Sequence, residues 1–200
     1  MKEAIKKFII EKAKGIFKDK GFKNATMDKI AEVSDISKPT LYKYFPSKEE
    51  LFHQVLISIN DEIDREILSS LNPEDSIFKN MKLIILKTIE FLLKHKQIMR
   101  IALFETGSFF KNSKDKKLHF QTIFKNRAKR KEFLINLIKE GQNNGAIRKD
   151  LDPEFLAISY LGIMKEISFE IIFLDLKIKD TEKVAENIVE VIINGIKKRG

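Results

Sequence analysis

Residues 26–51 read T-M-D-K-I-A-E-V-S-D-I-S-K-P-T-L-Y-K-Y-F-P-S-K-E-E-L, and this stretch decides the fold of the chain. Apolar residues recur at helical spacing over about 26–33 and again over about 37–45. The segment Ser34-Asp35-Ile36 joins these two short helices, so the pattern predicts a helix-turn-helix. In such a motif the second helix is the one offered to the major groove of DNA.

The residues that begin each helix support this interpretation. Thr26 and Ser37 stand at N-cap positions, where a hydroxyl accepts a hydrogen bond from the first turn. Pro39 falls in the first turn of the second helix, where its missing N–H costs nothing. Ser47 and Glu50 have the spacing of a capping box just before an apolar run, which predicts a third helix starting there.

The second helix of the motif divides into an inner and an outer face. Leu41 and Phe45 lie one turn apart and are expected to face inward. The residues left outside or on the flanks are Lys38, Pro39, Thr40, Tyr42, Lys43 and Tyr44. Hydroxyl groups, cations and amphipathic rings suit phosphate oxygens and base edges, so this face predicts DNA contact.

The run S-K-P-T-L-Y-K-Y-F-P-S-K-E-E-L, residues 37–51, closely resembles the DNA-binding signature of TetR-type transcriptional regulators. Residues 26–36 fit the same signature, and together the match covers about the first quarter of the chain. One residue departs from it, because Asp35 stands in the turn where the family usually has glycine. Aspartate tolerates left-handed backbone better than most residues, so we expect the turn to survive.

The resemblance implies a role for individual residues of the motif. Thr26 would contact a phosphate, Tyr42 would donate to one, and Lys48 would pair with another. The recognition surface would consist of Ser37, Lys38, Pro39, Thr40, Lys43 and Tyr44. Lys43 is the residue most expected to read a base, since lysine pairs well with the acceptors of guanine. The alternative is that the lysines are solvated and that the tyrosine rings close the small core.

Composition fits an ordinary two-domain protein with a polyanionic partner. The chain of 200 residues has a net charge of +9 and 43% hydrophobic residues, and residues 1–48 alone carry 12 Lys and 6 Asp or Glu. The excess positive charge is therefore concentrated in the predicted DNA-binding part, as counterion release at a phosphate backbone favours. We expect a DNA-binding domain over 1–48 and a helical effector-binding and dimerisation domain over 49–200.

Several other classes of protein are disfavoured. The chain has no cysteine, which excludes disulfides and thiolate metal sites. The N-terminus shows no signal peptide, and Lys165, Glu166 and Glu170 interrupt the longest apolar region, so we expect a cytoplasmic protein without a membrane span. Glu50 and His53 have the spacing of a di-iron ligand pair, but there is no second copy, so no metal or cofactor is expected. No phosphate-binding glycine loop or nucleophile elbow indicates an enzyme.

Helical patterns continue along the rest of the chain, without strand alternation. A first helix over 2 to about 20 should end at Gly21, after which Phe22 should fold back onto the bundle. The later helices are expected near 47–71, 75–95, 97–107, 117–143, 153–176 and 181–198. The chain is therefore predicted to be all-α, with a three-helix helix-turn-helix domain followed by a helical C-terminal domain.

The last two predicted helices are candidates for dimerisation. The final helix has a continuous apolar stripe, and the one before it has small residues that permit close packing. TetR-type proteins usually pair these helices with the same two of a partner, which implies an interface of Ser159, Gly162, Val184, Ile188, Val191, Ile192 and Ile196. The alternative is that the stripe covers only its own domain.

The middle helices of TetR-type proteins usually surround a small-molecule pocket. The corresponding residues here are rich in phenylalanine, which would suit a small hydrophobic effector. The candidates are Phe91, His95, Phe104, Phe120, Phe124, Tyr160, Glu166 and Phe169. Phenylalanine at helical spacing also forms ordinary core, so both interpretations stay open at this stage.

The leading hypothesis is a homodimeric repressor that binds a palindromic DNA operator and is released by a small hydrophobic ligand. The alternative is a helix-turn-helix regulator or architectural protein without a small-molecule effector. An enzyme in an all-helical bundle is the least favoured of the three hypotheses.

Overall fold

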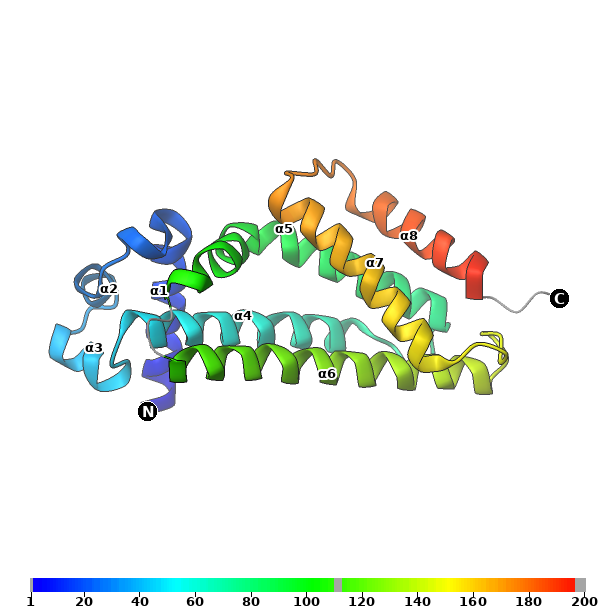
Figure 1. Cartoon of the computed structure of the whole chain (residues 1–200), viewed down its shortest axis with the longest axis horizontal. Helices are drawn as coiled ribbons and strands as arrows, with labels where there is room; N and C mark the ends of the chain where they lie inside the picture. The colour runs from blue at the N-terminus through cyan, green and yellow to red at the C-terminus, as the bar shows by residue number, and fades with distance from the viewer. Residues whose placement is uncertain (1, 110–112, 197–200) are drawn as a thin grey trace. The chain divides into compact units, whose positions relative to one another are not determined.

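The computed structural model describes residues 2–109 and 113–196, with side chains except in 103–125 and 193–196. This described part forms eight α-helices, as Figure 1 shows, and confirms the all-α class. The helices are α1 (Lys2–Asn24), α2 (Met27–Val33), α3 (Lys38–Tyr44), α4 (Lys48–Ser70), α5 (Ile77–Phe109), α6 (Ser113–Asn143), α7 (Pro153–Phe173) and α8 (Thr181–Ile196). None of the helices in these ranges is both long enough and apolar enough to cross a membrane.

The chain folds into two compact units. The first consists of residues 1–62 and 95–122, and the second of residues 63–94 and 123–200. Helices α4, α5 and α6 therefore each contribute residues to both units. The predicted DNA-binding domain of 1–48 falls entirely within the first unit, while its functional boundary at residue 48 stays a prediction.

The end of α1 confirms the role expected of Gly21. Its φ of 72° lies in the left-handed region and interrupts the helix, which resumes for a few residues to Asn24. Glycine adopts this backbone without the steric cost that a Cβ brings. Phe22 then folds back as predicted and is buried, with its ring centroid 5.8 Å from Phe17 and 5.2 Å from Phe52.

The prediction of two helices near 75–95 and 97–107 is wrong, because α5 runs unbroken from Ile77 to Phe109. Lys96 and Gln97, at the expected break, are good helix formers, and neither glycine nor proline stands there. Helix α6 begins at Ser113 rather than near residue 117. The starts of α7 and α8 agree with the sequence, and Asp152 caps α7 by accepting from the N–H of Phe155 at 2.9 Å.

The second unit combines an apolar core with ion pairs between its helices. Its buried side chains include Ile85, Ile89, Ile138, Ile147 and Ala185. The pairs join α4 to α6 (Asp64–Arg130, 2.9 Å), α5 to α8 (Lys82–Glu186, 2.8 Å) and α6 to α7 (Lys131–Glu154, 2.7 Å). These pairs are partly or largely exposed, so the buried apolar residues supply most of the stability.

Candidate DNA-binding site

The turn between α2 and α3 has the geometry that a helix-turn-helix requires. Asp35 has a φ of 51°, which confirms that it takes the left-handed backbone usually given to glycine. The Asp35 N–H donates to the Glu32 carbonyl and the Ile36 N–H to the Ala31 carbonyl, each at 3.1 Å. This pair of bonds is a Schellman motif, which ends α2 and fixes the direction in which α3 leaves.

The predicted N-caps of the motif are present. The Thr26 hydroxyl accepts from the Lys29 N–H at 3.2 Å, and the Ser37 hydroxyl accepts from the Thr40 N–H at 3.3 Å. At the start of α4, the Ser47 hydroxyl accepts from the Glu50 N–H at 3.1 Å. The Glu50 carboxylate accepts from the Gln54 side chain at 3.0 Å, so only the serine half of the expected capping box is seen.

Helix α3 presents its polar residues outward over an apolar interior. Leu41 is fully buried and Phe45, which caps the helix, is 2% exposed, as their spacing predicts. Of the residues assigned to DNA contact, Thr26, Ser37, Lys38, Pro39, Tyr42 and Lys43 are exposed, while Thr40 and Tyr44 are half-buried. The fold thus leaves these eight side chains at or near the surface of one short motif, which is formed by α2 and α3 (Figure 1).

Two contacts hold polar groups of this face together in the free protein. The Ser37 and Thr40 hydroxyl oxygens lie 2.8 Å apart. The Lys38 ammonium lies 2.6 Å from the Asp28 carboxylate of α2, and this hydrogen bond and charge raise the pKa of Lys38 above its ordinary value. Lys38 would exchange this carboxylate for a phosphate oxygen on DNA, because both are anionic acceptors.

The structure gives Lys48 partners that the sequence reasoning did not anticipate. Its ammonium donates to the carbonyls of Phe22 at 2.7 Å, Ala25 at 2.9 Å and Lys23 at 3.3 Å. It also lies 4.4 Å from the centroid of the Phe22 ring. The side chain expected to meet a phosphate is thus engaged within the protein.

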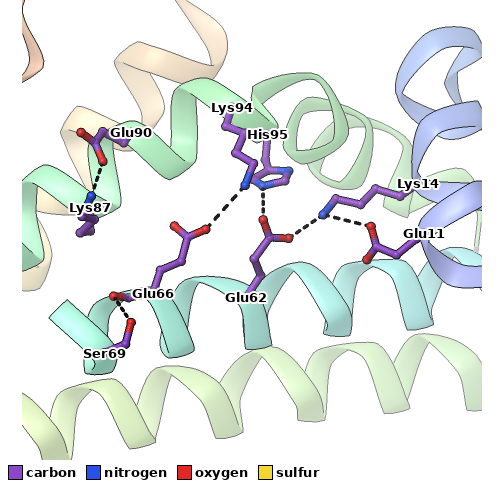
Figure 2. A network of polar contacts seen from close by, with 9 residues as sticks. All are labelled: Glu11, Lys14, Glu62, Glu66, Ser69, Lys87, Glu90, Lys94 and His95. Carbon is purple, nitrogen blue, oxygen red and sulfur yellow. Dashed lines mark hydrogen bonds and ion pairs between the residues drawn. The ribbon is translucent and has the colours of Figure 1, made fainter. Parts of the chain in front are cut away.

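A shared carboxylate links three helices of the first unit (Figure 2). The Glu62 carboxylate of α4 lies 2.5 Å from the Lys14 ammonium of α1 and 3.3 Å from Nε2 of His95 of α5. His95 is buried, and the side chains of Lys14 and Glu62 are 15% and 20% exposed. These partners are 48 and 33 residues apart in sequence, so no local motif could have indicated their contact.

Comparison with known proteins relates the motif to one family of regulators. Residues 9–55, which include the whole motif, match the family described as bacterial regulatory proteins, tetR family. The uncharacterized HTH-type transcriptional regulator YhgD of Bacillus subtilis is 26% identical over 166 residues, which cover 82% of this chain and 83% of that protein. The segment that holds the motif is therefore similar to the DNA-binding part of TetR-family regulators.

Solved structures agree with the fold of this chain over nearly its whole length. A transcriptional regulator of the TetR/AcrR family from Thermobifida fusca has a TM-score of 0.73 at 21% identity, covering 96% of this chain and 98% of that one. The fatty acid degradation regulator FadR of Bacillus halodurans has a TM-score of 0.72 at 18% identity, covering 97% of each chain. These likenesses show the fold, with its helical C-terminal part.

The structure separates the residues that the sequence assigned to a ligand pocket. Phe91, His95 and Tyr160 are buried, whereas Glu166 and Phe169 lie exposed on α7. The side chains of Phe104, Phe120 and Phe124 lie outside the described part. The Tyr160 hydroxyl has no hydrogen-bond partner among the described atoms, and its burial raises the pKa of this tyrosine.

A groove in the second unit includes one of these residues, Phe91. It has a volume of about 490 Å³ and is lined by Glu66, Ser69, Ser70, Lys87, Glu90, Phe91 and Lys94. Figure 2 shows the Lys87–Glu90 and Lys94–Glu66 pairs of this lining, at 2.9 and 3.5 Å. The charged side chains that line this groove differ from the apolar, phenylalanine-rich pocket that the sequence predicts.

The residues assigned to dimerisation are mostly at the surface. Ser159, Gly162 and Val191 are exposed, Val184 and Ile188 are half-buried, Ile192 is buried, and the Ile196 side chain lies outside the described part. Sequence reasoning missed Phe155 and Ile158, which are 66% and 48% exposed and share a face of α7 with Ser159 and Gly162. Phe169, assigned to the pocket, stands two turns beyond Gly162 on the same face.

No group of three or more His, Asp or Glu side chains within the described residues could hold a metal ion. His53, part of the considered Glu50–His53 ligand pair, is buried in the first unit.

Proposed function

We propose that this regulator is a homodimeric repressor that binds a palindromic operator through α3 and is released by a small hydrophobic ligand. The observation that carries the DNA-binding part is the exposed face of α3, fixed by the left-handed turn at Asp35 and the cap at Ser37. In this proposal Thr26, Tyr42 and Lys38 meet phosphates and Lys43 reads a base. These assignments follow from the chemistry of each side chain, since ammonium and hydroxyl donors suit phosphate oxygens and lysine also pairs with the acceptors of guanine.

The proposed dimer rests on the outer face of α7 and α8. Phe155, Ile158 and Phe169 are large apolar side chains left in water, and Val191 on α8 is 71% exposed. Large apolar side chains left exposed on one face indicate an interaction site. The small residues Ser159 and Gly162 lie among the large ones on α7, which permits two helices to approach closely.

The proposed effector site rests on Tyr160. Burying a hydroxyl without a hydrogen-bond partner costs about 1–3 kcal/mol. A ligand with an acceptor oxygen would satisfy that hydroxyl, and an apolar body would suit the phenylalanine-rich sequence around it. FadR is named for fatty acid degradation, and this name serves only to choose a fatty acid as the first probe.

Selection and sequencing of random DNA duplexes bound by the protein tests the proposal. A homodimeric reader should enrich a palindrome whose half-sites are centred about 34–36 Å apart, or a multiple of that distance. Addition of a fatty acid such as decanoate should then raise the thermal midpoint and release the selected duplex.

The second candidate is a regulator or architectural protein without a small-molecule effector. It would enrich a sequence but ignore every ligand tested. If no sequence is enriched and affinity follows only the salt concentration, the sequence-specific proposal fails and the architectural one takes its place.

A further inference from the structure

The Asp28 carboxylate lies on the same surface as the residues assigned to DNA contact. Asp28 is the second residue of α2, and its carboxylate lies 2.6 Å from the ammonium of Lys38, the first residue of α3. The side chains of Asp28 and Lys38 are 67% and 54% exposed, so the pair stands in solvent rather than in the core. A helix-turn-helix places the first residues of its second helix against base edges. A carboxylate so close to Lys38 would therefore lie near the bases of a duplex bound through α3.

DNA would take away the cation that this carboxylate holds in the free protein. Within the described residues, the Lys38 ammonium is the ion-pair partner of Asp28. The proposed function assigns Lys38 to a phosphate, so its ammonium would leave Asp28 when the complex forms. An ionised carboxylate accepts hydrogen bonds but cannot donate them. Asp28 would then face the bases as a charged acceptor that needs a new donor.

Hydrogen-bond donors are few on the major-groove edges of the bases. Cytosine presents its N4 amino group, and adenine presents its N6 amino group beside the acceptor N7. Guanine presents the acceptors O6 and N7, and thymine presents the acceptor O4 and a methyl group. A carboxylate therefore suits cytosine best, since each of the other bases sets an acceptor or a methyl group beside its oxygens.

We propose that Asp28 determines base specificity by accepting from the N4 amino group of one cytosine in each half-site of the operator. The inference rests on the proposed function, because it requires DNA binding through α3. A negative charge on this surface lowers affinity for every sequence, since all duplexes carry phosphates. It lowers affinity least where a cytosine satisfies the carboxylate, so Asp28 contributes discrimination between sequences rather than affinity.

Asp28→Asn and Glu32→Gln form a matched pair of variants. Each removes one negative charge from α2, and each of the two carboxylates is 67% exposed and lies 2.6 Å from a lysine. The lysine beside Glu32 is Lys29 of α2 itself, whereas the partner of Asp28 belongs to α3. Asparagine keeps an acceptor oxygen and adds N–H donors, so it can meet any base. We expect Asp28→Asn to lose the preference for cytosine at one position, and Glu32→Gln to keep it.

Selection and sequencing of random duplexes with the full-length protein tests this inference, followed by anisotropy titrations on the selected operator. For the wild type, replacing the cytosine by guanine or thymine should lower affinity by about 5- to 150-fold. The same replacement should change the affinity of Asp28→Asn little. Lys38→Met separates a direct contact from an effect through Lys38, because it should bind every sequence more weakly and still prefer the cytosine.

Circular dichroism checks that each variant is folded, and Asp28→Ser, which also accepts and donates, replaces Asp28→Asn if that variant does not fold. The inference fails if Asp28→Asn keeps the wild-type preference at every position, or if Lys38→Met loses the preference for cytosine. It also fails if Glu32→Gln relaxes the same position, because the effect would then come from net charge. In these cases the enriched palindrome remains and the proposed repressor stands. If the wild type enriches no sequence, both proposals fail together.

Discussion

The exposed face of α3 and the exposed face of α7 differ in the kind of side chain that they leave in water. On α3 the apolar Leu41 is buried and the exposed residues include Lys38, Tyr42 and Lys43. On α7 the exposed residues include Phe155 and Phe169, at 66% and 47%. Both are α-helices with the same backbone hydrogen bonding. The two faces therefore differ only in their side chains, and so in the kind of surface that each can bind.

The contrast teaches that the two faces should respond oppositely to salt. Contacts of cations with DNA weaken as salt rises, because the released counterions return to the phosphates. Association of apolar faces does not depend on such ions and is strengthened by salts excluded from protein surfaces. In the proposed function, one molecule carries a polar surface for a polyanion and an apolar surface for a second copy of itself.

Gly162→Leu should have the largest effect on DNA affinity, because it prevents the proposed association of two α7 faces. A Cβ at Gly162 meets no atom within 4 Å in the protomer, so the fold should accept the new side chain. In the proposed dimer the added bulk would separate the two α7 helices. We expect a monomer by sedimentation, and loss of simultaneous binding to two half-sites should lower DNA affinity by about 10²- to 10⁴-fold.

Gly15→Leu is the matched control for this change, since Gly15 is also exposed and open around its Cβ position. It should keep the oligomeric state. A dimeric Gly162→Leu protein with unchanged DNA affinity would contradict the proposed interface.

Lys43→Ala should have the next largest effect and act on the polar face. If Lys43 reads a base, its removal should cost about 1–3 kcal/mol of binding free energy and relax the preference at particular positions of the operator. Tyr42→Phe removes a hydroxyl assigned to phosphate and should weaken all sequences alike. Repeating the duplex selection with each variant compares the two. Equal weakening of every sequence by Lys43→Ala would remove its assignment to a base.

Asp28→Asn should strengthen DNA binding by a smaller, severalfold factor. It releases the Lys38 ammonium from its 2.6 Å contact and removes a negative charge beside the predicted phosphate surface. Glu32→Gln is the control, because it removes the same charge from α2 where the partner is Lys29. Anisotropy titrations at low salt measure the difference. Weaker binding by Asp28→Asn would show that the carboxylate orients Lys38 for DNA.

Lys82→Met should have the smallest effect and leave both faces unchanged. Hydrogen bonding to Lys82 holds the pKa of Glu186 below its ordinary value of 4.5, so the pair stabilises the folded protein at neutral pH. That contribution is lost as the pH falls through the lowered pKa of the folded state. Wild type and variant should therefore differ slightly in thermal midpoint at neutral pH and converge in acid. A difference that persists in strong acid would indicate a packing role for the Lys82 stem.

Local chemistry in the sequence was enough to predict the helix-turn-helix. The caps at Thr26 and Ser37, the left-handed Asp35 and the inward Leu41 all depend on residues within one or two turns. The partners of Lys48 were not predictable in this way, because its carbonyls come from 23 to 26 residues earlier in the chain. The contact of Glu62 with Lys14 and His95 was not predictable for the same reason, because these partners are 48 and 33 residues away in the sequence.

Periodicity alone also could not say which side of a helix faces the core. Helix α7 is apolar on more than one side, so Phe169 was assigned to a pocket although it lies exposed beside the dimerisation residues. The assumed break near Lys96 failed because a change in apolar pattern does not end a helix whose residues all favour helical backbone.

The division of α4 and α5 between the two units bears on how the protein is made. The first unit needs residues 95–122 as well as residues 1–62, and the segment between them belongs to the second unit. A chain emerging from the ribosome can form the helix-turn-helix early, since its contacts are local. His95 cannot reach Glu62 until at least 95 residues have been synthesised, and the first unit is complete only after residue 122. The unit that contains the helix-turn-helix therefore receives its last residues only after more than half of the chain has been synthesised.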